Sequence, residues 1–243
     1  MAKTRHSYRP ACWARTGIRA VLRAVEYLAL RVANTRRNGK RLSAGVDNLL
    51  KARVLASACD DSTSVLDVGC GNGTRLEEMS LFLDEVVRLV GVDVAKREPP
   101  GLPGSRPPEL EAFDGQSLPF DNGSFDTTCV CYVLHHLAPE HAERLLAECL
   151  RVTRKRILIL EDSMPEWSTS YRLRNWAHLR EANMLYGEES DDFSTFYGTQ
   201  GFLTQTEWQT QLGSMLSVDH VNIHQLKGIK RYEHHTMFEV VLS

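Results

Sequence analysis

The chain has 243 residues, of which 42% are hydrophobic and 25% are charged, and its net charge is −2. These values are ordinary for a soluble globular protein, and the length allows one large α/β domain or two small ones. No stretch approaches the roughly 20 apolar residues that span a bilayer, and the first residues lack the apolar core of a secretory signal peptide. The six cysteines form no C-x-x-C pair. We therefore expect reduced thiols, no metal site, and Cys129 and Cys131 as small buried side chains.

The small net charge conceals a basic N-terminal region. Residues 1–59 hold thirteen Lys and Arg against two acidic residues, a net charge of +11, and the remainder carries −13. The first 25 residues contain no acid, and their apolar side chains recur at helical spacing. Three interpretations stay open: an amphipathic helix covering the sheet, a mitochondrial presequence, or a surface for nucleic acid or an anionic membrane. The predicted compartment is the cytoplasm, with the mitochondrial matrix as the alternative.

The most informative segment lies at residues 65–74. Helical patterns at 14–33 and 43–58 precede an apolar strand at 64–68, and a helix is expected at 73–83. Between strand and helix the chain reads D-x-G-x-G-x-G, from Asp67 through Gly69 and Gly71 to Gly73. Strand, glycine loop and helix form a nucleotide-shaped site in α/β sheets, because glycines let the backbone approach a ligand closely.

The next two strands are also expected to end in acids. A strand at 86–92 ends at Asp93, and a short strand at 109–113 ends at Asp114 and Gly115. Between them, residues 98–108 contain five prolines and two glycines. Such a segment cannot form a helix of any length, so the usual crossover helix must be short, displaced or absent.

The second half of the chain predicts the rest of the sheet. We expect strands at 125–132 and 156–160 around a helix at 139–152, then a helix near 170–186, a loop at 193–198 and a helix near 206–212. Two strands at about 216–224 and 235–242 complete the pattern. Alternating strands and helices indicate a mostly parallel sheet.

The acids at the strand ends suggest a nucleoside ligand. A carboxylate at Asp93 can accept both hydroxyls of a ribose, and one at Asp114 can accept from an adenine amine. Each acid also has a purely structural interpretation, Asp93 as a helix N-cap and Asp114 as a turn former. The glycine loop, Asp93 and Asp114 occur together at successive strand ends, and this combination favours a ligand site over the structural interpretations.

In these motifs the chain resembles the class I S-adenosylmethionine (SAM)-dependent methyltransferases, in particular the methyltransferase type 11 group. The likeness runs from about residue 65 to 162, some 40% of the chain, and its later motifs are Phe113-Asp114-Gly115, Leu118-Pro119-Phe120, Ser124-Phe125-Asp126 and Val133-Leu134-His135-His136-Leu137. The resemblance implies a Rossmann-like α/β fold with a seven-stranded, mostly parallel sheet and an antiparallel final strand. To this the chain would add N-terminal helices at 1–60 and, within a methyltransferase domain at 61–243, a small cap at about 163–205.

The resemblance also implies a cofactor site for SAM, with S-adenosylhomocysteine (SAH) as product. The glycines would approach the methionine part, Asp67 would orient its amino group, Asp93 would hold the ribose and Asp114 the adenine amine, and Tyr132 would line the methyl-donor face. The expected cofactor-binding set is Asp67, Gly69, Cys70, Gly71, Gly73, Asp93, Val94, Asp114, Gly115 and Tyr132. The proline-rich segment departs from the family pattern, so the resemblance does not predict the shape of the site beside the adenine.

Catalysis needs a base only when the acceptor must lose a proton. His135 after the fourth strand and Asp162 after the fifth are the candidates, although His135 could simply begin the next helix, and Glu161 and Asp162 could cap one. Aromatic residues after residue 163 suggest a lid over an aromatic or apolar acceptor or, alternatively, packing against the N-terminal helices.

The leading functional hypothesis is SAM-dependent methyl transfer to the oxygen, nitrogen or carbon of a small molecule. An RNA methyltransferase is the alternative, which rests only on the basic N-terminal region. A SAM-binding assembly factor without activity is the third. The sequence leaves the oligomeric state open.

Overall fold

The structure is a computed structural model, and it describes residues 42–95, 97–163, 203–217, 221–227 and 234–242. The helices predicted at 14–33 and 170–186 and the loop predicted at 193–198 lie outside these residues. So does most of the cap predicted at 163–205.

Seven strands form one sheet with the order β3-β2-β1-β4-β5-β7-β6. Five strands are parallel, and β7 runs antiparallel to both β5 and β6. The strands are β1 (Ser64–Val68), β2 (Arg88–Asp93), β3 (Glu109–Ala112), β4 (Phe125–Cys131), β5 (Thr153–Asp162), β6 (Asn222–Lys227) and β7 (His234–Val241). This arrangement confirms the predicted Rossmann-like seven-stranded sheet.

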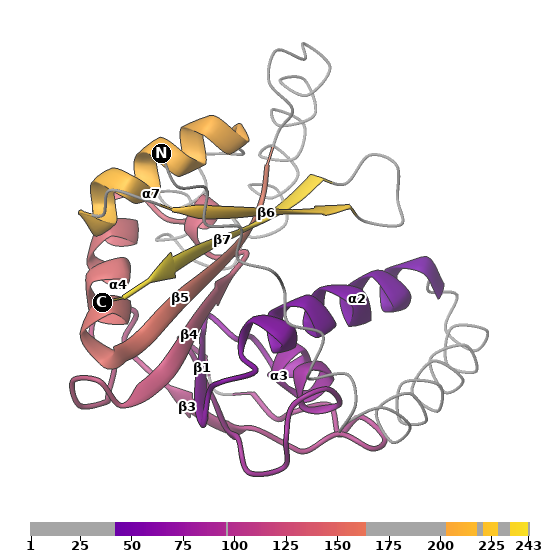
Figure 1. Cartoon of the computed structure of the whole chain (residues 1–243). Coiled ribbons are helices and arrows are strands. Elements are labelled where there is room, and N and C mark those ends of the chain that lie inside the picture. The colour runs from indigo at the N-terminus through magenta and orange to yellow at the C-terminus, as the bar shows by residue number, and fades with distance from the viewer. Residues whose placement is uncertain (1–41, 96, 164–202, 218–220, 228–233, 243) are drawn as a thin grey trace, which may run out of the picture.

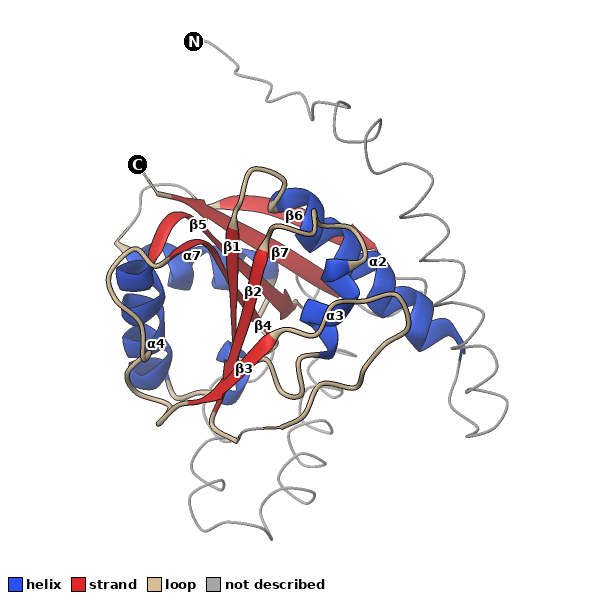
Figure 2. Ribbon diagram, turned by 90° about the horizontal axis from the view of Figure 1, so that it is seen from below, coloured by secondary structure: helices blue, strands red, loops and turns tan. Residues whose placement is uncertain are grey.

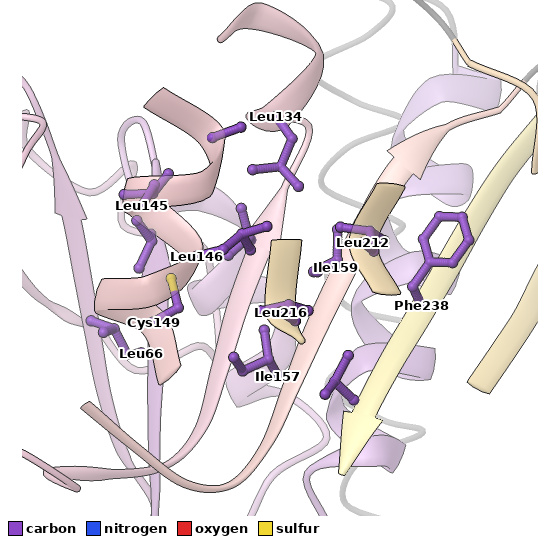
Figure 3. Close-up of a cluster of buried hydrophobic side chains, with 14 of the residues drawn as sticks. Leu66, Leu134, Leu145, Leu146, Cys149, Ile157, Ile159, Leu212, Leu216 and Phe238 are labelled. Atoms are coloured by element: carbon purple, nitrogen blue, oxygen red, sulfur yellow. The ribbon is translucent and has the colours of Figure 1, made fainter. Parts of the chain in front are cut away.

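Helices α4 (Pro139–Val152) and α7 (Gln205–Leu216) cover one face of the sheet (Figures 1 and 2). Leucine and cysteine side chains of α4 interdigitate with Leu66, Ile157 and Ile159 of the strands, and α7 adds Leu212 and Leu216 (Figure 3). Burial of apolar surface on this scale is the main stabilising contribution in a domain. It holds the strand ends in a fixed register, which positions the residues that follow them.

Helices α2 (Leu42–Ala58) and α3 (Thr74–Ser80) cover the other face. In α2, Ala52 and Leu55 have no exposed surface, and they share a cluster with Val65 of β1 and Leu76 of α3. The boundary predicted at residue 60 remains a prediction, but α2 packs in the same core as β1. Four of the five cysteines in the described residues are buried free thiols, Cys129 and Cys131 among them, as expected.

The proline-rich segment is extended, and the residues described between β2 and β3 contain no helix. It is fastened to α3 instead: the carboxylate of the buried Glu77 accepts hydrogen bonds from the backbone amides of Gly101 (3.0 Å) and Leu102 (3.1 Å). Further on, the Arg106 amide donates to Ser80 Oγ at 2.8 Å. A strap held by side chains thus replaces the crossover helix.

The C-terminal elements differ from prediction at one place. The strand expected at 216–224 is wrong in its first part, because α7 continues to Leu216 and β6 begins only at residue 222. Trp208, Leu212 and Leu216 are all buried and recur every four residues, a spacing that belongs to one face of a helix. The side chain of Thr204 caps the start of this helix.

Candidate functional site

The glycine loop joins β1 to α3 at the carboxyl edge of the sheet, where open α/β folds bind ligands. All three glycines have positive φ. A Cβ on Gly69 would meet Val133 Cγ2 at 2.4 Å, and one on Gly73 would meet Pro108 at 3.0 Å, so both are needed for packing within the protein. A Cβ on Gly71 would meet nothing within 4 Å. Gly71 is therefore the glycine that faces open space.

Asp93 braces this loop. Its Oδ2 accepts the backbone N–H of Gly71 at 2.8 Å, and its Oδ1 accepts that of Ala95 at 3.2 Å. The carboxylate therefore fixes the loop and remains partly exposed at the end of β2. Because each carboxylate oxygen has two lone pairs, it keeps acceptor capacity for further hydroxyl donors.

Asp67 and Arg75 place opposite charges beside the loop. Asp67 is 2% exposed, and burial raises its pKa to about 7, opposed by the charge of Arg75 and reinforced by that of Asp93. Asp67 Oδ1 and Arg75 Nη1 are both buried, and neither has a hydrogen-bond partner within the described part of the chain. Buried polar atoms normally have one. Two unsatisfied groups of opposite charge at a strand edge are suited to a ligand that carries both signs.

Tyr132 follows β4 and adopts a left-handed backbone conformation with φ 60. Such strain in a residue other than glycine tends to occur at functional sites. Two cations lie near its ring: Arg75 Cζ is 5.1 Å from the ring centroid and Lys51 Nζ is 5.6 Å away. Burial raises the pKa of the Tyr132 phenol above its ordinary value.

The Tyr132 hydroxyl contacts a histidine, which in turn contacts an aspartate. It lies 3.1 Å from Nδ1 of His235 in β7, and the same nitrogen lies 2.5 Å from Asp162 Oδ1 at the end of β5. His235 is buried, whereas the Asp162 side chain is 35% exposed. Tyr132, His235 and Asp162 are called the Tyr132 cluster below.

His135, the other predicted catalytic residue, belongs to a separate pair. Its Nδ1 lies 2.5 Å from Oε2 of the fully buried Glu161. The other oxygen of Glu161 accepts the backbone N–H groups of Val133 (3.0 Å) and Leu134 (2.7 Å). Burial would lower the pKa of His135, but the hydrogen bond and charge of Glu161 outweigh it and raise that pKa. Asp162 and His135 are thus not brought together.

The remaining predicted residues lie along the edge formed by β2 and β3. Val94 is 64% exposed, and a Cβ on Gly115 would touch it at 3.4 Å. Asp114 is exposed, and its Oδ1 accepts from the amides of Gln116 and Ser117, both at 2.8 Å; these bonds lower its pKa. Cys70 turns inward against Gly91, and burial, reinforced by Asp67 and Asp93, raises its pKa to about 12.

Sequence reasoning missed Lys51, Arg75 and His235 as site residues. Arg75 follows the glycine motif directly and could have been found there. Lys51 and His235 come from α2 and β7, and only the assembled fold brings them to Tyr132. Within the described residues no cluster of His, Cys, Asp and Glu could hold a metal ion, and no helix is long and apolar enough to cross a membrane.

The sheet order and the positions of the motifs agree with the comparisons with known proteins. Residues 66–159, less than half of the chain, match a family model described as a methyltransferase domain. This match confirms the resemblance drawn from the motifs. Two of the similar solved structures show the same fold at low identity. A magnesium protoporphyrin IX methyltransferase from Synechocystis, crystallised with SAH, has a TM-score of 0.54 at 16% identity over 82% of this chain and 85% of that chain. A 1,6-didemethyltoxoflavin-N1-methyltransferase from Burkholderia thailandensis has a TM-score of 0.54 at 17% identity over 91% and 87%.

Similarity to curated proteins covers part of each chain. A demethylmenaquinone methyltransferase from Beutenbergia cavernae is 33% identical over 137 residues, which make up 52% of this chain and 52% of that protein. An uncharacterised 37.1 kDa protein in transposon TN4556 of Streptomyces fradiae is 34% identical over 116 residues, 44% of this chain and 31% of that protein. The chain thus spans about half the length of the first relative and about a third of the second.

Proposed function

We propose that this protein is an enzyme that transfers the methyl group of SAM to a small-molecule acceptor. The observation that carries the proposal is the pair of buried, unpartnered polar atoms, Asp67 Oδ1 and Arg75 Nη1, beside the glycine loop. The amino-acid part of SAM carries an ammonium and a carboxylate on one carbon. Asp67 would accept from the ammonium and Arg75 would donate to the carboxylate, so each group would satisfy one that the protein leaves open.

The rest of the site suits a nucleoside. Asp93 keeps lone pairs for the ribose hydroxyls while its bonds to Gly71 and Ala95 hold it in place. The exposed Val94 beside Gly115 offers an apolar floor for a planar base. Asp114 uses one oxygen in its turn, which leaves Oδ2 for an exocyclic amine. When bound, SAM supplies an electrophilic methyl group, and the protein has to align the acceptor and exclude water.

The proposed acceptor class is a planar ring compound. The Beutenbergia relative is named for a demethylated menaquinone, and at 33% identity it is the relative whose name bears most directly on substrate. The names of the two structural neighbours also contain ring systems, a porphyrin and a toxoflavin precursor. Reduced quinones therefore come first among the acceptors to be tested.

The proposal is tested by measuring SAH formation from SAM with reduced naphthoquinones, simple phenols and N-heterocycles. We expect SAH to accumulate only with an acceptor present and to vanish in Asp93→Ala. Asp121→Ala, which changes an exposed acid in the loop before β4, serves as the matched control. SAM binding without SAH formation on any member of the panel would instead favour the assembly-factor alternative.

A further inference from the structure

β5 ends in two neighbouring acids that serve opposite faces of the sheet. Side chains along β5 alternate between the two faces of the sheet. Glu161 lies on the same face as Ile159, which α4 covers, and Asp162 lies on the same face as Leu160, which α2 and α3 cover. Each acid pairs with a histidine at 2.5 Å. Asp67 lies on the Asp162 face, since it is two residues after Val65 of the cluster under α2 and α3, and Arg75 Cζ lies 5.1 Å from the centroid of the Tyr132 ring. The Asp162–His235 pair is therefore the one on the side of the proposed SAM methionine site.

The two pairs also differ in how they are used. Both oxygens of Glu161 are hydrogen-bonded to the turn after β4, one to backbone amides and one to His135. Glu161 is fully buried, so this pair is explained by the fold alone. Asp162 is partly exposed, and His235 also contacts the hydroxyl of Tyr132. The second pair thus extends toward the site through a phenol whose backbone is strained.

His235 Nδ1 has two partners but can hold only one proton. At 2.5 Å from Asp162 Oδ1, Nδ1 shares a proton with that carboxylate oxygen. Once this proton lies on Asp162, Nδ1 can accept the Tyr132 hydroxyl, whose oxygen lies 3.1 Å away. The position of one proton therefore decides which partner His235 engages.

We propose that Tyr132, His235 and Asp162 form a proton relay that deprotonates the acceptor during methyl transfer. The acceptor O–H or N–H bond breaks, and its proton passes to the Tyr132 oxygen. The Tyr132 proton passes to His235 Nδ1, while the proton that Nδ1 shared with Asp162 passes to Asp162 Oδ1. The freed electron pair of the acceptor bonds to the methyl carbon as the carbon–sulfur bond breaks, and that bond's electrons stay on sulfur as a neutral thioether. Asp162, whose side chain is 35% exposed, then releases the proton to solvent. The relay rests on the proposed function.

Charged and polar groups of α2, α3, β4 and β5 bear on this relay. Arg75 of α3 and Lys51 of α2 approach the Tyr132 ring and favour transient negative charge on its oxygen. Asp162 and Glu161 of β5 and Cys131 of β4 act in the opposite sense on Tyr132. Tyr132 is the catalytic residue in this scheme, and His235 and Asp162 act through it.

The first test asks whether the relay exists in the protein without substrate. Histidine and tyrosine side-chain resonances of the SAM-bound protein are recorded by NMR for the wild-type, Asp162→Asn and His224→Gln proteins. We expect Asp162→Asn to change the Tyr132 Cζ resonance, because Tyr132 and Asp162 both contact Nδ1 of His235. A Tyr132 resonance that Asp162→Asn leaves unchanged would overturn the relay.

The second test is turnover with naphthalene-1,4-diol and SAM. Tyr132→Phe and His235→Gln are each expected to lower kcat by about 100-fold, in the range typical of a lost proton-transfer group, with the Kd for SAM changed by less than about twofold. Imidazole added to His235→Ala should restore part of the rate, which a merely structural role would not allow. The matched control is His224→Gln, which disrupts the His224–Glu239 pair (3.0 Å) in the same hairpin and should retain full turnover.

The outcomes separate the relay from the proposed function. Failure of the wild-type protein to bind SAM would contradict the proposed function. Binding and turnover with an undiminished rate in His235→Gln would contradict the relay alone. If SAM binds but the diol is not methylated, the response of the Tyr132 resonance to Asp162→Asn decides for or against the relay.

Discussion

Asp67 and Arg75 are costly residues for a protein to bury. Each has a buried polar atom without a partner in the described structure, and an unsatisfied buried polar group costs roughly 1–3 kcal/mol. A ligand that supplies both missing partners regains this free energy on binding. In the proposed function, the cost in the free protein becomes a source of affinity for the zwitterionic end of SAM.

The raised pKa of Asp67 predicts an unusual pH dependence of stability. Its pKa is about 7 in the folded protein against an ordinary value of 3.8, so between these values the folded state holds a proton that the unfolded state has lost. The free energy of unfolding should therefore fall as pH rises from about 4 to about 7, by at most about 1.4 kcal/mol per pH unit. Urea unfolding of the SAM-free protein measures this slope, and Asp67→Asn should flatten it. An identical slope in the variant would show that Asp67 titrates normally.

The glycines of the loop predict two different phenotypes. Gly69→Ala should destabilise the fold by about 3 kcal/mol, because its Cβ would clash with Val133 and the left-handed backbone adds strain. Gly71→Ala has space for its methyl group, so only strain of about 1–2 kcal/mol is expected. Thermal unfolding and SAM calorimetry separate the effects: Gly71→Ala should remain folded and lose SAM affinity. A Gly71→Ala protein with wild-type affinity would place the ligand elsewhere.

At the scale of elements, the proline-rich segment shows how side chains can replace a crossover helix. Glu77 holds two of its amides, and Pro108 packs against Gly73 of the cofactor loop. The segment therefore supports the loop from behind, although none of its residues belongs to the predicted site.

Removing this anchor should weaken both stability and binding. Glu77→Ala leaves the amides of Gly101 and Leu102 without their acceptor, at a cost of about 1–3 kcal/mol. Chemical denaturation measures that loss, with Glu111→Ala on the exposed edge strand β3 as a control. A loss no larger than that of Glu111→Ala would mean that the segment is held mainly by its other contacts.

Most elements could be predicted from sequence because their signals are local. The helix at Pro139–Val152 matches the prediction to the residue, since a proline marks its start and apolar residues recur along one face. The start of β6 was placed too early, because Leu216 fits a strand as well as a helix until the contacts of α7 are known. The Glu77 anchor could not be foreseen, since it joins residues 24 and 25 positions apart through the tertiary fold.

In the candidate site, too, residues marked by local sequence signals could be predicted, and contacts made through the tertiary fold could not. Its glycines and strand-end acids were found because they form a contiguous motif or end a strand. The partners of His135 and Asp162 were not found: each was considered as an isolated base, whereas the alternation of β5 sends Glu161 and Asp162 to different histidines. His235 lies 73 positions beyond Asp162 in the chain, and no local pattern marks it.

At the scale of the whole molecule, the sheet brings the strand ends, the glycine loop and the Tyr132 cluster to one edge. The described core fixes the strand ends, the glycine loop and Asp93 form the proposed nucleoside site there, and the Tyr132 cluster lies where β4, β5 and β7 meet. The basic residues 1–41 lie outside the described structure.

The most direct test of SAM binding through Asp93 is calorimetric titration of the full chain with SAM. We expect saturable binding to the wild-type protein and to Asp121→Ala, and loss of binding in Asp93→Ala, with all three proteins folded by circular dichroism. Unchanged SAM affinity in a folded Asp93→Ala protein, or no binding by the wild-type chain, would contradict this expectation.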